Sequence, residues 1–153
     1  ERLTARLVGG VIHKTDCTAD YCPDVSTATH YFESKAVGNS KTAFVYEGRL
    51  DKDRRFVAAG NRLLYVIWHH RASTANVVTV EQLEELVLRS MVDVRVVPFS
   101  VISDLCASMK PDKLNSKYGG SDSRPTYSSG YRLPLKLTDR WIVKTFSGDV
   151  PCH

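Results

Sequence analysis

A continuous apolar run over Leu63–Trp68 is the feature that most constrains the fold of this chain. Its sequence, LLYVIW, is partly β-branched and aromatic, and it lacks the polar alternation of a strand with one face in water. Strands that read in this way are covered on both faces. The run therefore predicts a central strand with a packing layer on each side.

The segments around this run predict those layers. A helix is expected over 79–92, where Thr79 and Gln82 form a capping box ahead of an apolar stripe. The stripe consists of Val80, Leu83, Leu86, Val87 and Met91. A shorter helix is expected over 51–60 and a buried strand over 94–99. This alternation favours an α/β (α+β) fold, a mixed central β-sheet flanked by helices.

The two ends of the chain add further elements. A helix over 1–8 is closed by a pair of glycines, and two strands of a meander are expected over 24–28 and 30–37. The stretch 42–50 fits either another strand or the start of a helix. The apolar tail over 131–146 is expected to add an edge strand to the sheet.

Length and composition indicate one globular domain. The chain has 153 residues, 42% of them apolar and 25% charged, which suits a single domain over 1–153. The net charge of +4 allows a nucleic-acid partner without requiring one. There is no run of about 18 apolar residues and no secretory signal pattern, so no membrane partner is expected. The expected location is the cytoplasm or the nucleoid.

The chain has four cysteines: Cys17, Cys22, Cys106 and Cys152. They are too few for a disulfide scaffold in a chain of this size, so we expect thiols in a reducing compartment. A zinc site at Cys17 and Cys22, with His13 and His30 nearby, is an alternative. Its cysteine spacing is not that of the usual zinc sites.

One group of charged residues indicates chemistry. Side chains alternate along a strand, so Glu33 and Lys35 point to one face while Phe32 and Ser34 point to the other. A hairpin that begins at Asp24 returns the chain beside this strand and brings a second carboxylate to the same place. Two carboxylates there would bind a divalent metal, and a water near the metal and the lysine would become a nucleophile.

The pattern Pro23-Asp24, eight residues, Glu33-Ser34-Lys35 resembles the signature of the PD-(D/E)XK nuclease superfamily. This resemblance implies Mg²⁺, or Mn²⁺ in its place, bound by Asp24 and Glu33, with the backbone carbonyl of Ser34 completing the coordination. It implies that Lys35 positions or activates the attacking water. Glu1 matches the helical glutamate that some members add to the metal site.

The resemblance also implies a fold and an activity. The core of the superfamily runs helix, three strands, helix, strand, and is restriction-endonuclease-like. Phage junction-resolving endonucleases are loosely similar, although the stretch between the motif and the Asp- and Arg-rich helix at 51–55 is longer here. The implied activity is metal-dependent endonuclease hydrolysis of phosphodiester bonds in double-stranded or branched DNA. RNA stays open as a substrate, and nucleases that cut both strands often work as homodimers.

Two other segments are candidates for nucleic-acid binding. The segment 109–130, rich in glycine, serine and proline, is predicted to be a mobile basic loop that contacts phosphates and stacks on bases. Its cations are Lys110, Lys113, Lys117 and Arg124. His69, His70 and Arg71 end the central strand, where ligands gather in open α/β sheets. A solvated loop and a solvated strand end are the plainer interpretations.

Two other functional classes compete with the nuclease. A non-catalytic nucleic-acid-binding or assembly module on the same scaffold would use the basic segment and leave the acidic pair without a role. A structural or interaction domain would use neither. Chelator-sensitive cleavage separates the nuclease from both alternatives, and salt-dependent binding without cleavage selects the first of them.

Overall fold

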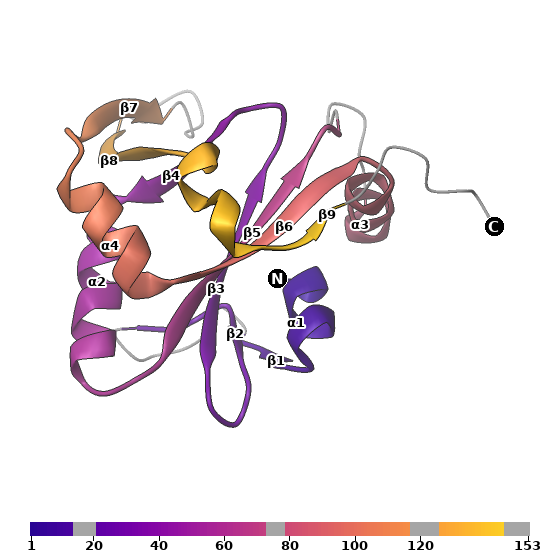
Figure 1. The fold of residues 1–153 in the computed structure, drawn as a ribbon, viewed down its shortest axis with the longest axis horizontal. Helices are drawn as coiled ribbons and strands as arrows, with labels where there is room; N and C mark the ends of the chain where they lie inside the picture. The colour runs from indigo at the N-terminus through magenta and orange to yellow at the C-terminus, as the bar shows by residue number, and fades with distance from the viewer. Residues whose placement is uncertain (14–20, 73–78, 117–125, 146–153) are drawn as a thin grey trace.

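The computed structural model describes residues 1–13, 21–72, 79–116 and 126–145. Over these residues the main sheet has six strands in the order β1-β2-β3-β5-β6-β9 (Figure 1). Their bounds are Val11–Ile12, Val25–Ser26, Tyr31–Val37, Leu63–His70, Met91–Pro98 and Ile142–Thr145. Strands β3 and β5 pair in parallel, and the other neighbours pair antiparallel. The predicted mixed sheet is thus confirmed, with β9 as its edge strand.

Helices cover both faces of this sheet. Helices α1 (Arg2–Val8) and α3 (Val80–Arg89) lie on one face, and α2 (Glu47–Ala58) and α4 (Phe99–Ala107) on the other (Figure 1). Strand β5 supplies apolar side chains to the core on each side, in alternation along its length. This confirms the central strand predicted from the run at 63–68.

A smaller sheet packs beside α2 and α4. It has the order β4-β8-β7, with bounds Thr42–Tyr46, Thr126–Pro134 and Asp112–Ser116. Val45 and Leu133 from this sheet join the same buried cluster as Tyr65 and Ile67 of β5. A short 3₁₀ helix, η1 (Leu135–Trp141), then leads from β8 to β9.

The prediction of a loop over 109–130 was wrong at both ends of the segment. Residues 112–116 and 126–130 are strand, and they pair antiparallel in the register Lys113↔Ser129. Backbone groups that were expected to meet water are therefore paired with each other. The part between these strands, with Lys117 and Arg124, lies outside the described residues.

Local signals explain where two of the helices begin and end. Helix α1 ends at Gly9, whose φ of 64° lies in the left-handed region that favours glycine. Helix α3 begins with the predicted capping box of Thr79 and Gln82. It ends earlier than the predicted residue 92, because Met91 is a buried residue of β6 and not part of the helical stripe.

Within the described ranges, no helix is both long and apolar enough to cross a bilayer.

Candidate active site

Glu33 and Lys35 lie on one face of β3, as the strand alternation predicted. The ammonium of Lys35 lies 2.6 Å from Oε1 of Glu33, and the glutamate side chain is buried. Ser34 points to the opposite face, where its hydroxyl lies 2.8 Å from that of Thr4 in α1. The face that carries Glu33 is the one covered by α2 and α4.

Asp24, just ahead of β2, is held beside β3. The backbone N–H of Ser34 donates to Oδ2 of Asp24 at 2.7 Å. Strand β2 pairs with β3 at Phe32 and Tyr31, so this hydrogen bond lies just past the last backbone pairing. The N–H and C=O of one strand residue point to the same edge, which places the Ser34 carbonyl on the Asp24 side. Asp24 and the Ser34 carbonyl thus lie along the same side of β3, next to the residue that carries the Glu33 carboxylate.

Arg49 of α2 binds the other oxygen of Glu33. Its guanidinium donates to Oε2 of Glu33, to the carbonyl of Cys22 at 3.2 Å and to the hydroxyl of Tyr21 at 3.3 Å. The guanidinium carbon also lies 4.6 Å from the centre of the Tyr21 ring. Arg49 thus connects Glu33 to the segment that carries Asp24.

Behind Arg49 lies a second, fully buried carboxylate, Asp53. Its Oδ1 is 3.1 Å from Nε of Arg49, a distance typical of an ion pair, although the two atoms fall outside hydrogen-bond geometry. The hydroxyl of Tyr65 donates to Oδ2 of Asp53. Burial and the carboxylate both raise the pKa of Tyr65, so this phenol stays protonated and remains a donor.

Burial raises the pKa of Glu33 above its ordinary value, and the nearby Asp24 carboxylate raises it further. The cations Lys35 and Arg49 act in the opposite direction. Glu33 is therefore a buried acid whose charge is stabilised by two cations. The metal site of Asp24 and Glu33 stays a prediction.

The donor set of Asp24, Glu33 and the Ser34 carbonyl fits Mg²⁺ in chemical type, because Mg²⁺ takes oxygen ligands. A metal would, however, have to compete with Lys35 and Arg49 for the oxygens of Glu33. Among the described residues, no three His, Cys, Asp or Glu side chains lie together as a metal-binding group. The site is therefore limited to two carboxylates and a backbone oxygen.

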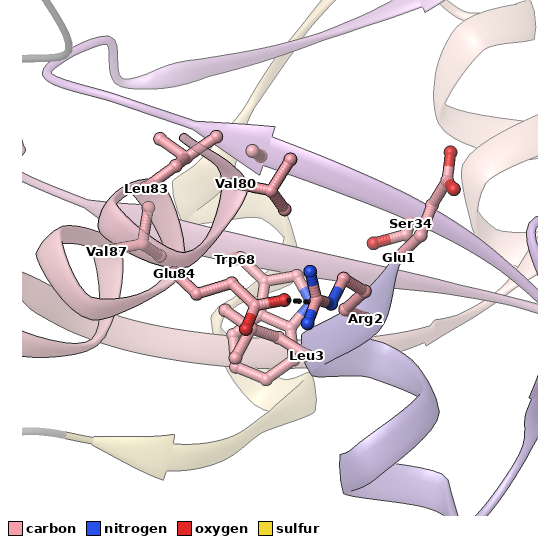
Figure 2. A pocket seen from close by; sticks show the side chains of 10 residues that line it. Glu1, Arg2, Leu3, Ser34, Trp68, Val80, Leu83, Glu84 and Val87 are labelled. Atoms are coloured by element: carbon pink, nitrogen blue, oxygen red, sulfur yellow. Dashed lines mark ion pairs between the residues drawn. The ribbon is translucent and has the colours of Figure 1, made fainter. Parts of the chain in front are cut away.

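Glu1, expected as a further metal ligand, lies at the start of α1, and its role as a ligand stays a prediction. It lines a cavity of about 330 Å³ together with Ser34 and Trp68, where α1 and α3 cover the sheet (Figure 2). That face is opposite to the one that carries Glu33. An ion pair of 2.9 Å between Arg2 and Glu84 joins the two helices beside the cavity (Figure 2).

The three residues that end β5 have different environments. Nδ1 of His69 lies 3.2 Å from Asp93, and Arg71 is exposed. His70 is buried, and its Nδ1 accepts from the backbone N–H of Ala72 at 3.1 Å. Burial and the neighbouring His69 lower the pKa of His70. His70 is thus an interior residue, and its assignment as a nucleic-acid contact was wrong.

Of the four cations assigned to the basic segment, Lys110 and Lys113 are described, and both are exposed. Lys113 lies in β7 of the smaller sheet. Lys117 and Arg124 lie outside the described residues. The surface formed by Lys110 and Lys113 is therefore separate in the fold from the strand that carries Glu33.

The prediction of reduced thiols was wrong for Cys22, which is disulfide-bonded. Cys106 of α4 is a free, buried cysteine, and burial raises the pKa of its thiol to about 11. His13 and His30, the histidines of the alternative zinc site, interact with Ser26 and Thr29. Cys17 and Cys152 lie outside the described residues.

The sequence analysis missed Arg49, Asp53 and Tyr65. The available signal was the spacing of Arg49 and Asp53, which is one helical turn and puts both on one face of a helix. It was missed because the helix was expected to begin at residue 51, whereas α2 begins at Glu47. A comparison with protein-family models, curated proteins and solved structures finds no match to this chain.

Proposed function

We propose that the protein is a metal-dependent endonuclease that hydrolyses phosphodiester bonds in DNA, with Asp24, Glu33 and Lys35 as its catalytic residues. The observation that supports this proposal is that Asp24 accepts from the backbone of Ser34 while the neighbouring residues Glu33 and Lys35 pair with each other on β3. The order of elements gives further support. Helix α1, strands β1 to β3 and helix α2 precede a strand that pairs in parallel with β3.

In this proposal Asp24, Glu33 and the Ser34 carbonyl hold Mg²⁺, which Mn²⁺ can replace. The bound metal supplies a water of lowered pKa and neutralises charge on the phosphate. Lys35 is held by Glu33, so its ammonium is fixed where it can orient a water and stabilise charge that develops on the phosphate. Arg49 favours the ionised form of Glu33 and so opposes the rise in its pKa that burial causes.

One observation favours a second candidate, a nucleic-acid-binding module without catalysis. Both oxygens of Glu33 already have cationic partners, Lys35 and Arg49. A buried carboxylate that is paired in this way is stable without a metal. In this candidate the cluster is structural, and the exposed lysines provide the binding surface.

The deciding experiment incubates the protein with Mg²⁺ or Mn²⁺ and plasmid, branched DNA or RNA. We expect chelator-sensitive cleavage of DNA that is lost, by at least about a hundredfold, in Lys35→Ala and Glu33→Gln. DNA affinity should change little in Lys35→Ala, because the lysine is assigned to the chemical step. The matched control is Asp104→Asn, which neutralises an exposed carboxylate on α4 and should cleave normally.

Each other outcome of this experiment has a defined meaning. DNA binding without cleavage under any metal would reject the endonuclease and select the binding module. Equal losses of binding and cleavage in Lys35→Ala would make the lysine an ordinary phosphate contact. Cleavage of RNA in preference to DNA would keep the site and change the substrate.

The cellular location and the assembly state follow from this proposal only indirectly. The cytoplasm or nucleoid is where a DNA endonuclease would meet its substrate. The disulfide at Cys22 argues against a reducing compartment, where structural disulfides are rare.

A homodimer would account for the cutting of both strands, and it is tested by the mass of the protein in solution with and without DNA.

A further inference from the structure

A second cavity lies at the carboxyl end of β5, close to the first residues of β4 and η1. Its volume is about 430 Å³, within the range of pockets that bind small ligands. The residues that line it are Lys41, Thr42, His69, Pro134, Leu135, Lys136 and Asp139. We call it the His69 cavity. In open α/β sheets, ligands bind beyond the carboxyl ends of the parallel strands.

The walls of the His69 cavity are held in place by backbone pairing. The N–H of Leu135 donates to the carbonyl of Lys41 at 2.9 Å, which joins the beginning of β4 to the beginning of η1. Thr42 pairs with Pro134 in the smaller sheet. The lysines at 41 and 136 are therefore carried by paired backbone rather than by free loops, and Pro134 and Leu135 provide an apolar wall.

An ion-pair network orients His69. Nδ1 of His69 lies 3.2 Å from Asp93, which is also paired with the buried Arg95. Arg95 in turn holds Asp139 at 2.9 Å. A carboxylate at Nδ1 fixes the ring and leaves Nε2 as the nitrogen for a ligand. Arg95 is shared between Asp93 and Asp139, so these three groups together with Lys41 and Lys136 leave one net positive charge.

Arg95 does not line the cavity, but it holds Asp139, which does. Arg95 is 4% exposed, and its Nε is a buried donor with no hydrogen-bond partner within the described part of the chain. Unpaired buried donors are rare and indicate a missing partner such as a water or a ligand.

We propose that the His69 cavity binds the phosphate of a nucleotide, either a free mononucleotide or one nucleotide of a strand. Lys41 and Lys136 bind the phosphate oxygens, and His69 contributes Nε2. The apolar wall of Pro134 and Leu135 accommodates the base or sugar. The proposal does not depend on the proposed nuclease, because none of these residues belongs to the cluster around Glu33.

The test is calorimetric titration with AMP, adenosine and a short oligothymidylate in the presence of chelator, which keeps the metal site out of the measurement. We expect AMP or the oligonucleotide to bind, and adenosine to bind at least about tenfold more weakly because it lacks the phosphate. Binding of AMP identifies a free nucleotide as a ligand. Binding of the oligonucleotide alone identifies a strand.

The matched variants are Lys41→Ala/Lys136→Ala, His69→Asn and, as control, Lys52→Ala on the exposed face of α2. The double variant should lose at least about tenfold in affinity, while the control keeps it. Because both lysines are exposed, the fold should survive, and circular dichroism checks it. No binding of AMP or oligonucleotide, equal binding of AMP and adenosine, or an unchanged double variant would overturn the proposal.

Discussion

At the scale of single residues, the buried polar network behind Glu33 depends on Tyr65. The Tyr65 hydroxyl donates to Asp53, a carboxylate with no exposed surface. Loss of a donor to a buried charge costs about 1–3 kcal/mol or more. Tyr65→Phe should therefore lower the free energy of unfolding by about that amount, as measured by urea denaturation.

The control for this experiment is Tyr46→Phe, which removes a hydroxyl from a side chain that is 47% exposed. Its effect should stay within about 0.5 kcal/mol. Equal stability of Tyr65→Phe and the wild type would mean that Asp53 needs no donor from β5. Such a result would leave Arg49 as the polar partner that matters for this carboxylate.

His70 gives a prediction about pH. Its pKa is lowered from 6.5 by burial and by His69, and its Nδ1 must stay unprotonated to accept from Ala72. The unfolded chain therefore takes up this proton at a higher pH than the folded protein does. The free energy of unfolding should fall as the pH drops below about 6.5, by the linkage between proton uptake and stability.

The measurement is urea denaturation of the wild type and of His70→Gln at a series of pH values between about 5 and 8. Glutamine keeps an acceptor for Ala72 and has no titrating group, so the variant should lose part of the slope below about pH 6.5. Identical slopes in the two proteins would show that other groups cause the pH dependence.

At the scale of elements, the sequence predicted best where a local signal marks the end of an element. The capping box at Thr79 and the glycine pair after residue 8 placed α3 and α1 correctly. Helix α4 was missed, although Phe99, Ile102 and Cys106 repeat at helical spacing and are buried. Pro98, at its N-cap, lies inside the stretch 94–99 that was predicted to be strand.

Strands β7 and β8 show what sequence patterns miss. Their segment is rich in serine, glycine and lysine, and such residues are typical of loops. The strands form because β8 pairs with β4, and this pair is anchored in the core through Val45 of β4 and Leu133 of β8. Tertiary pairing of this kind overrides local propensity. The same limit applied to Arg49 and Asp53, whose roles depend on the packing of α2 against β3.

The cap of α3 allows a test at this scale. Thr79 accepts from the N–H of Gln82, and the Gln82 side chain accepts from the N–H of Thr79. Thr79→Ala removes the first bond and should destabilise the protein by about 1 kcal/mol in thermal or urea unfolding. Thr79→Ser keeps the hydroxyl and should destabilise the protein much less than Thr79→Ala does. Equal losses in both variants would indicate that the methyl group, and not the cap, matters.

At the scale of the whole molecule, the sheet separates two kinds of surface. The face under α1 and α3 carries an apolar cavity whose rim is closed by ion pairs such as Arg2 to Glu84. The opposite face carries the Glu33 cluster and, farther along β5, the His69 cavity. The side chains of Glu33, Lys35 and Val37 point to this face of β3. They lie beside Tyr65, Ile67 and His69, with which they are in register on β5. Both candidate sites therefore belong to one continuous side of the sheet.

The proposed binding of DNA gives a prediction at this scale, about which surface of the molecule contacts the DNA. Lys110 and Lys113 are exposed beside the smaller sheet, and Lys41 and Lys136 are exposed at the His69 cavity. Each phosphate that a lysine neutralises contributes about 0.9 to the slope of log affinity against log salt for duplex DNA. Lys110→Ala/Lys113→Ala should therefore lower the slope by up to about 2 if both contact the backbone.

The measurement is DNA affinity at several salt concentrations for the wild type, this double variant, Lys41→Ala/Lys136→Ala and the single control Lys52→Ala. A lower slope in the first double variant places the DNA across the smaller sheet, in line with the role expected for the basic segment. An unchanged slope in Lys110→Ala/Lys113→Ala, with a lower slope in Lys41→Ala/Lys136→Ala, would instead mean that the DNA lies along the face that carries Glu33 and His69. In that geometry the phosphate bound at the His69 cavity and the phosphate at Lys35 would belong to the same strand.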